Sequence, residues 1–235
     1  MHTFTQGGYD YQSIKAILAE LDQYRPGWQA EGVIVEVGAN IGTTTLMLAS
    51  HAPVIAFEPI SSNVALLRQN LLVNDLQDRV TVRAAAVSEV SGEVTMELSV
   101  DNHGDHRVRL TNTPGSYDEQ ARGTVSVPSV RLDDELRAQN VSLVWMDAQG
   151  HEAQVLAGAP NLLASAAPMV IEYWPYGLRR AEGLDLLERL VAEHFTTVVD
   201  TSSHGRARVL EADDVPALRD RYRTDGEHTN LLLLH

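Results

Sequence analysis

Short apolar runs and longer mixed stretches alternate along the first third of the chain. Apolar runs rich in β-branched residues lie at 33–37, 54–58 and 80–84, and the stretches between them, 43–51 and 61–74, predict helices. Strands that alternate with helices favour a parallel sheet with helices on both faces. The pattern therefore predicts an α/β fold.

The alternation continues through the rest of the chain. It predicts a short strand at 94–98, an ordered segment at 125–132, a helix at 133–138, a strand at 141–146, a helix at 150–164, a strand at 169–173, a helix at 184–194 and strands at 197–200 and 230–234. Ahead of the first strand, apolar residues at helical spacing predict an amphipathic helix over residues 10–24. No internal repeat and no domain boundary is visible, so we expect a single domain over residues 1–235.

Residues 100–123 interrupt this alternation. Polar residues, glycine and proline dominate them, and we interpret them as one long loop. Long loops in compact domains often act as lids or binding segments, although a solvated insertion would have the same composition. We expect a lid, and its histidines, His103 and His106, are candidate acceptor-binding residues.

The sequence V-I-V-E-V-G-A-N-I-G at 33–42 joins a strand to a glycine turn and a helix start. Gly38 and Gly42 allow the backbone to turn with positive φ and allow a ligand to approach the main chain. Glu58 ends the next strand, where a carboxylate can accept hydrogen bonds from both hydroxyls of a ribose. Together these residues predict a nucleoside site.

The spacing of the glycines indicates which nucleoside ligand fits. Dinucleotide folds favour G-x-G-x-x-G because the pyrophosphate rests on the turn, whereas here Asn40 stands at the middle position. This turn favours a nucleoside with a small zwitterionic tail, such as S-adenosylmethionine (SAM). It disfavours a NAD-dependent oxidoreductase. A non-catalytic SAM-fold protein that serves as a binding or scaffold subunit stays the main alternative to an enzyme.

Composition and charge exclude several classes of protein. The chain has 235 residues, a formal net charge of −14 and no cysteine. The acidic balance argues against a nucleic-acid partner, and the lack of cysteine excludes thiol chemistry. No apolar run is long enough to span a membrane and the N-terminus lacks the features of a signal peptide, so we expect a cytoplasmic protein without a membrane partner. The oligomeric state is left open.

Polar residues follow several predicted strands, and the carboxyl ends of parallel strands share one edge of the sheet. Asp147, Glu172, Tyr173 and Trp174 are expected there, with His151 shortly after Asp147. Asp147, His151 and Glu172 are candidate catalytic residues, because carboxylate and imidazole groups can accept a proton from a hydroxyl. Helix capping also explains Asp147, and polar surface also explains His151. Tyr173 and Trp174 are candidate acceptor-binding residues.

Five blocks of sequence occur in one order: V-E-V-G-A-N-I-G, F-E-P, A-A-A-V-S with a later S-G-E-V, M-D-A-Q-G-H-E-A-Q-V-L-A-G-A and M-V-I-E-Y. In these blocks, which cover most of the chain, it resembles the FkbM family of SAM-dependent methyltransferases. The resemblance implies a Rossmann-like class I methyltransferase fold with a seven-stranded, mostly parallel sheet whose last strand is antiparallel. It also implies SAM as methyl donor and, usually, a hydroxyl oxygen as acceptor, on a natural product, a sugar or a modified peptide.

The resemblance further implies which residues hold SAM. The residues that would face the methionine part are Glu36, Gly38, Asn40 and Gly42. Glu58 would hold the ribose. The residues that would border the adenine are Pro59, Ile60, Ala85 and Ala86. Asp147 would lie near the methyl group. The family commonly has Val-Glu-Gly after this aspartate, whereas this chain has Ala148-Gln149-Gly150. A role that needs a charge at position 149 is therefore in doubt.

A divalent metal is the alternative to a protein base. Asp147 and Glu172 offer the hard oxygen ligands that suit Mg²⁺. The segment His103-Gly104-Asp105-His106 has ligand types for a transition metal, although a solvated loop explains it better. We favour a protein base over a metal. The resulting interpretation is a SAM-dependent O-methyltransferase that acts on a small molecule or peptide.

Overall fold

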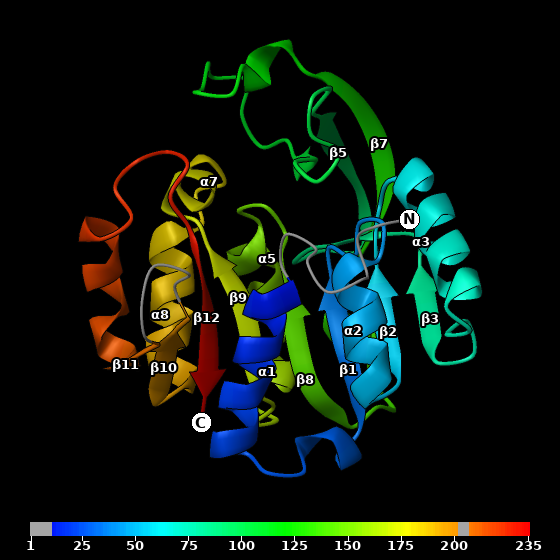
Figure 1. Cartoon of the computed structure of the whole chain (residues 1–235). Coiled ribbons are helices and arrows are strands. Elements are labelled where there is room, and N and C mark those ends of the chain that lie inside the picture. The colour runs from blue at the N-terminus through cyan, green and yellow to red at the C-terminus, as the bar shows by residue number, and fades with distance from the viewer. Residues whose placement is uncertain (1–10, 202–206) are drawn as a thin grey trace.

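The computed structural model describes residues 11–201 and 207–235 of the chain. Its centre is an eight-stranded sheet with the order β11-β10-β12-β9-β8-β1-β2-β3 (Figure 1). These strands are β1 (Val33–Val37), β2 (Val54–Phe57), β3 (Val80–Arg83), β8 (Val141–Met146), β9 (Met169–Tyr173), β10 (Thr197–Asp200), β11 (Arg208–Glu211) and β12 (Thr229–Leu234). Adjacent strands in the run β3-β2-β1-β8-β9 are parallel to one another. Strand β12 lies between β9 and β10 and is antiparallel to both.

The sheet has one strand more than the seven expected. The additional strand, β11, pairs antiparallel with β10 at the edge of the sheet. Only Leu210 of its four residues is buried, so the strand carries no apolar run that would have revealed it. The other seven strands lie where the hydrophobic pattern predicts them, with ends that differ by one residue at most.

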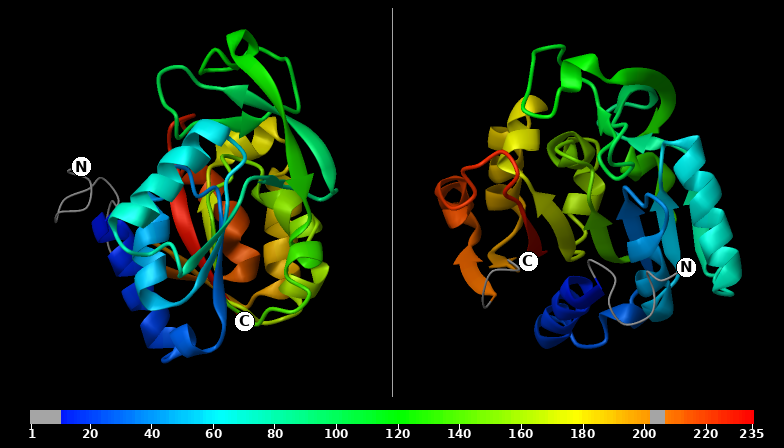
Figure 2. Two further views of the ribbon diagram at one scale, coloured as in Figure 1. Left: turned by 90° about the vertical axis from the view of Figure 1, so that its right-hand side faces the viewer. Right: turned by 45° about the horizontal axis from the view of Figure 1, so that its top comes forward.

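Helices cover both faces of this sheet (Figures 1 and 2). On one face, α1 (Tyr11–Tyr24), α2 (Thr43–His51) and α3 (Ser61–Val73) contribute Leu21, Leu48 and Leu67 to a shared core. On the other face lie α5 (Glu152–Ala157), α6 (Pro160–Leu163), α8 (Leu184–His194) and the 3₁₀ segment η3 (Ala212–Asp220). Residue 10, the expected start of the first helix, lies outside the described residues.

The expected helix 150–164 is in fact two helices, α5 and α6. Ala159 between them has φ −131° and ψ 47°, because a residue that precedes a proline avoids the helical region. The expected helix 133–138 is the shorter α4 (Leu132–Glu135), and α7 (Pro175–Arg180) follows β9. Within the two described ranges, none of the helices has both the length and the apolar character that crossing a bilayer requires.

A second, four-stranded sheet stands over the carboxyl ends of the parallel strands, as both views of Figure 2 show. In the order β4-β7-β5-β6 its strands are β4 (Ala86–Val87), β7 (Gly123–Val130), β5 (Gly92–Leu98) and β6 (Arg107–Val108). The segment expected to be one long loop joins β5 to β7 and contains β6 and the short 3₁₀ helix η2 (Glu119–Ala121). This arrangement places residues 100–123 above the edge where the site was expected.

Candidate active site

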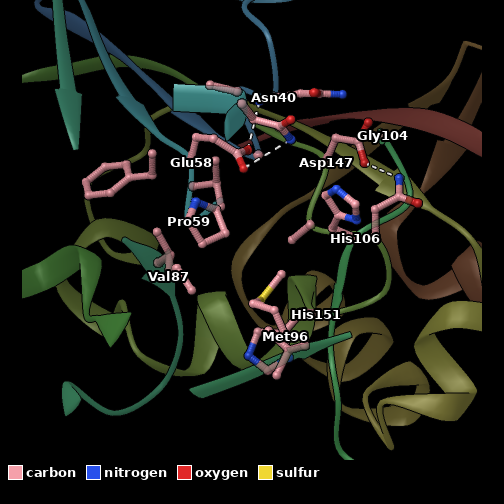
Figure 3. Close-up of a pocket in the computed structure, with 18 of the residues that line it drawn as sticks. Asn40, Glu58, Pro59, Val87, Met96, Gly104, His106, Asp147 and His151 are labelled. Carbon is pink, nitrogen blue, oxygen red and sulfur yellow. Dashed lines mark hydrogen bonds between the residues drawn. The ribbon is translucent and has the colours of Figure 1, made fainter. Parts of the chain in front are cut away.

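A cavity of about 250 Å³ opens beyond the carboxyl ends of β1, β2 and β8 (Figure 3). Separate parts of the chain line it, among them the turn after β1, the end of β2, the residues at β4, strand β5, the loop before β6 and the turn after β8. One lining residue from each is, in that order, Asn40, Glu58, Ala86, Met96, His106 and Asp147. Ligand sites of open α/β sheets lie at this edge.

The turn after β1 brings the main chain against Asp147. Gly38 has φ +86°, and any side chain there would place its Cβ 1.9 Å from the carbonyl oxygen of Asp147. Asn40 also has positive φ, +50°, which asparagine tolerates better than most residues. Gly38 and Asn40 line the cavity, whereas Gly42 lies behind it, where a Cβ would meet Leu67.

Glu58 lies on the cavity wall and joins the ends of two strands. Its Oε2 accepts a hydrogen bond from the backbone N–H of Asn40 at 2.9 Å, and its Oε1 accepts one from the backbone N–H of Ile60 at 2.9 Å. Burial raises the pKa of Glu58, and these two donors oppose the rise because they stabilise the ionised form. A carboxylate fixed in this way is a preorganised acceptor for hydroxyl groups of a ligand.

Glu36 was expected beside the methionine part of SAM, but it does not line the cavity. Side chains alternate along β1, so Glu36 lies on the opposite face from Val35 and Val37. It is 2% exposed, and burial raises its pKa to about 8. The protonated form therefore prevails at neutral pH, and a direct contact of Glu36 with a ligand stays a prediction.

The turn after β8 links two carboxylates through one amide. Nε2 of Gln149 donates to Asp147 Oδ1 at 2.6 Å and to Glu172 Oε2 at 3.2 Å. Glu172, near the end of β9, is 9% exposed. Burial raises its pKa well above the usual range, and the negative charges of Asp147 and Glu152 add to that rise. Asp147 and Glu172 are thus brought together, with Gln149 between them.

His151 lies beside Met96, at the end of the cavity away from Asn40 (Figure 3). Its Nε2 is 3.0 Å from the hydroxyl oxygen of Ser88. Burial lowers the pKa of His151 to about 4, so the ring is neutral at neutral pH and holds a proton weakly. This position favours a role in lining the cavity, and proton acceptance by His151 stays a prediction.

His103 and His106 line the same cavity, next to the turn after β1. Their ring centroids are 5.6 Å apart at an interplanar angle of 78°. Nδ1 of His106 accepts a hydrogen bond from the backbone N–H of Ser99 at 3.1 Å, which fixes the ring. In the part of the chain that the structure describes, no three His, Asp or Glu side chains gather as a metal site.

A larger cavity of about 960 Å³ adjoins the first. Asn40, Asp147 and Gln149 line both cavities, so the two meet at the turns after β1 and β8. Glu172 and Trp174 line the larger cavity from the main sheet.

Tyr173 is a correction to the expected acceptor-binding pair. It is fully buried, and its hydroxyl donates to Glu188 Oε1 at 2.7 Å. Because side chains alternate along β9, Glu172 reaches the cavity while Tyr173 enters the core on the other face. Trp174 lies on the cavity wall, and its Nε1 donates to the carbonyl oxygen of Asp225 at 2.6 Å.

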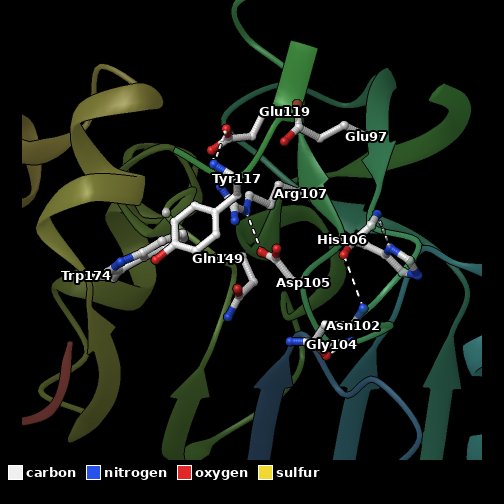
Figure 4. Close-up of polar contacts among 12 residues, drawn as sticks. Glu97, Asn102, Gly104, Asp105, His106, Arg107, Tyr117, Glu119, Gln149 and Trp174 are labelled. Carbon is white, nitrogen blue, oxygen red and sulfur yellow. Dashed lines mark hydrogen bonds and ion pairs between the residues drawn. The ribbon is translucent and has the colours of Figure 1, made fainter. Parts of the chain in front are cut away.

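An ion-pair network in residues 105–122 was missed by the sequence analysis (Figure 4). Arg107 pairs with Asp105 at 2.5 Å and with Glu119 at 3.0 Å, and Arg122 pairs with Asp105 at 2.5 Å. Glu119 also accepts a hydrogen bond from the hydroxyl of Tyr176 on α7 at 2.7 Å. Ion pairs therefore hold this segment together and the hydrogen bond from Tyr176 attaches it to α7, and the closely spaced acidic and basic residues were the only signal in the sequence.

The chain is similar to known methyltransferases over most of its length. A sequence profile of the methyltransferase FkbM domain matches residues 36–196. The 2-O-methyltransferase NoeI of Sinorhizobium fredii is 28% identical over 158 residues, which cover 60% of this chain and 63% of that protein. The hexuronic acid methyltransferase AglP of Haloferax volcanii is 26% identical over 148 residues, which cover 61% of this chain and 56% of that protein. The chain thus matches less than two thirds of either relative.

Among solved structures, the methyltransferase FkbM of Methylobacillus flagellatus superposes with a TM-score of 0.52 at 16% identity, over 86% of this chain and 43% of that one. At this identity the likeness shows the fold alone. It confirms the expected Rossmann-like fold of class I methyltransferases.

Proposed function

Because this chain belongs to the FkbM methyltransferase family, we propose that it transfers a methyl group from SAM to a hydroxyl oxygen of a small molecule. The observation that carries the proposal is the meeting of two cavities at Asp147 and Gln149. Methyl transfer is an in-line displacement, which needs donor and acceptor aligned on opposite sides of one carbon. A junction between two cavities would allow that alignment, and alignment is a large part of catalysis in such reactions.

The smaller cavity fits a nucleoside with an amino acid tail. Glu58 would accept hydrogen bonds from the ribose hydroxyls, because the N–H groups of Asn40 and Ile60 already hold its carboxylate in place. Gly38 and Asn40 would face the methionine part, because the glycine has no side chain that would keep a ligand away from the main chain. Pro59, Ala86 and Met96 are lining residues that would border the adenine.

SAM, when bound, supplies an electrophilic methyl carbon. The protein must then orient the acceptor hydroxyl and remove its proton. We favour Glu172 as the base, because it lines the larger cavity and its raised pKa gives the carboxylate a stronger hold on a proton. Asp147, which lines both cavities, would orient the hydroxyl.

We propose a sugar hydroxyl as the acceptor group. This rests on analogy with the two relatives, one a 2-O-methyltransferase and the other a hexuronic acid methyltransferase. The volume of about 960 Å³ in the larger cavity is at the upper end of ordinary small-molecule sites. A glycoside of more than one ring is compatible with that space.

The proposal is tested by incubating the protein with SAM that carries an isotope-labelled methyl group and with a panel of glycosides. Label is expected on a sugar hydroxyl, and Asp147→Asn should abolish labelling while SAM still binds. Binding of SAM without transfer to any glycoside would contradict the proposal and favour a non-catalytic SAM-binding subunit. Binding of NAD in place of SAM would favour an oxidoreductase.

A further inference from the structure

The larger cavity carries more carboxylates than cations. Of the described residues that line it, the acidic ones are Asp101, Asp105, Asp118, Asp147 and Glu172, and the arginines are Arg107 and Arg122. Even when Glu172 is left out of the count, four carboxylates stand against two guanidinium groups. Among the described lining residues the histidine is His228, which lies 4.0 Å from Glu172 and would pair with its carboxylate when the imidazole is charged. A negatively charged acceptor would meet an unfavourable field here.

Both guanidinium groups are already paired within the protein, and Figure 4 shows the pairs that Arg107 makes. Arg107 and Arg122 each contact Asp105 at 2.5 Å, and their side chains are only 6% and 8% exposed. Arg107 also contacts Glu119 at 3.0 Å, and Arg122 contacts Glu97 at 3.6 Å. A carboxylate on an incoming acceptor would have to displace one of these buried partners, so neither arginine is available as its counter-ion.

Aromatic rings form the other part of the cavity wall. Tyr117 and Trp174 meet edge to face, with ring centroids 6.0 Å apart at an interplanar angle of 64°. Tyr117 is 38% exposed, so part of its ring faces the cavity. A pyranose presents C–H groups on its faces and hydroxyl or amino groups at its edge, which suits a wall of aromatic rings beside carboxylate acceptors.

We propose that the larger cavity takes a glycoside without negative charge and selects an amino sugar over a neutral sugar, and a neutral sugar over a carboxylated one. This selection rests on the proposed function, since it assumes that the cavity holds the methyl acceptor. Asp105 contributes most to this selection, because among the carboxylates that line the cavity it is the one that pairs with both arginines.

The experiment measures binding of three methyl glycosides of one ring configuration, a glucosaminide in its protonated form, a glucoside and a glucuronide. Ligand-observed NMR follows each in the presence of saturating S-adenosylhomocysteine. The glucosaminide is expected to bind about tenfold or more tighter than the glucuronide, a difference of about 1.4 kcal/mol. Tightest binding of the glucuronide, equal binding of all three, or binding of none would overturn the proposal.

Two variants locate the cause of the selection. Asp105→Asn leaves the charges of Arg107 and Arg122 less balanced, so it should raise the affinity for the glucuronide at least about threefold. Asp118→Asn is the matched control: it removes an exposed lining carboxylate at a position with φ +52°, which asparagine accepts, and leaves the arginines paired. It should weaken the glucosaminide modestly without strengthening the glucuronide. If both variants act alike, Asp105 has no special part in the selection.

Calorimetry with S-adenosylhomocysteine separates this proposal from the proposed function. Absence of binding in the wild-type protein would overturn the proposed function. Normal binding together with preference for the glucuronide would overturn only the charge selection. Normal affinity in Asp105→Asn would show that this variant is folded, so that its glycoside binding can be interpreted.

Discussion

Gln149 donates its side-chain amide to Glu172 over 3.2 Å, so an uncharged group lies between this residue of the larger cavity and Asp147, which lines both cavities. The same nitrogen donates to Asp147 over 2.6 Å. A glutamate at this position, which the family resemblance of the sequence implies, would place a third carboxylate against the other two. The amide instead stabilises the ionised forms of both neighbours.

Gln149→Glu should therefore shift the pH dependence of methyl transfer. If Glu172 is the base, the rate rises with pH as this residue loses its proton. A carboxylate at position 149 replaces a hydrogen-bond donor with a like charge, which raises the pKa of Glu172 and moves the rise to higher pH. The rate at neutral pH should fall about tenfold, and a pH–rate profile measures both effects.

Gln149→Ala is the matched control for this profile. It removes the hydrogen-bond donor without adding a charge, so the increase of the rate with pH should also shift to higher pH, but by a smaller amount. A profile that is unchanged in both variants, or that moves to lower pH, would remove Gln149 and Glu172 from the proton transfer.

Two substitutions decide between the candidate bases. Glu172→Gln keeps the shape of the side chain and should lower kcat by about 10²–10⁴-fold. His151→Ala should leave kcat nearly unchanged, because a pKa of about 4 makes the imidazole a weak base and because His151 lies beside Met96 and does not line the larger cavity. Single-turnover rates at saturating SAM measure the effect. The reverse pattern would assign the proton to His151.

Glu36→Gln should stabilise the protein at alkaline pH. The folded-state pKa of Glu36 is about 8, above the ordinary value of 4.5, so the folded protein keeps a proton that the unfolded chain releases. The stability that this group contributes is complete below about pH 4.5 and is lost as the pH rises to about 8. Near pH 8 the variant should exceed the wild type by about 4 kcal/mol in urea unfolding, and near pH 4 the two should agree.

A control for this experiment is Glu89→Gln, at an exposed position. It should leave the free energy of unfolding within about 0.5 kcal/mol at every pH. If Glu36→Gln follows the wild type across the whole range, Glu36 ionises normally in the folded protein.

Glu119→Gln should loosen the segment that closes the larger cavity. Glu119 is fully buried and accepts hydrogen bonds from Arg107 and from the hydroxyl of Tyr176. Removal of one partner of a buried ion pair costs about 3–5 kcal/mol, so hydrogen exchange should accelerate over residues 107–122. Asp220→Asn, which removes an exposed pair with Arg223, should change no protection. Equal protection in the two variants would show that the network does not hold the segment.

The parts of the site that the sequence predicts are those that depend on local backbone chemistry. The glycines and their spacing predict the turn from Gly38 to Gly42, and the end of the next strand predicts the position of Glu58. The structure places Gly38, Asn40 and Glu58 on one cavity. Strand alternation could have excluded Tyr173 once Glu172 was assigned to the cavity. The same alternation predicts that Glu36 lies on the face of β1 opposite to Val37, and Val37 is the residue that lines the cavity.

The larger cavity could not be predicted in the same way. Its wall depends on contacts between residues far apart in the sequence, such as Glu119 with Tyr176 and Trp174 with Asp225. The segment that supplies Arg107 and Tyr117 has no apolar periodicity, and its order comes from ion pairs, which hydrophobic patterns do not report. That residues 1–235 form a single domain stays a prediction.

The central claim, that the smaller cavity holds SAM through Glu58, is tested most directly by calorimetric titration of SAM and of NAD. The wild type should bind SAM with a Kd in the micromolar range, about −8 kcal/mol, and should not bind NAD. Glu58→Ala should weaken SAM binding by about 1–3 kcal/mol, because the ribose hydroxyls lose their charged acceptor. It should also lower stability, because the N–H groups of Asn40 and Ile60 lose their partner, so circular dichroism must show that the variant is folded. No SAM binding up to millimolar concentration, or equal affinity in a folded Glu58→Ala variant, would contradict the account.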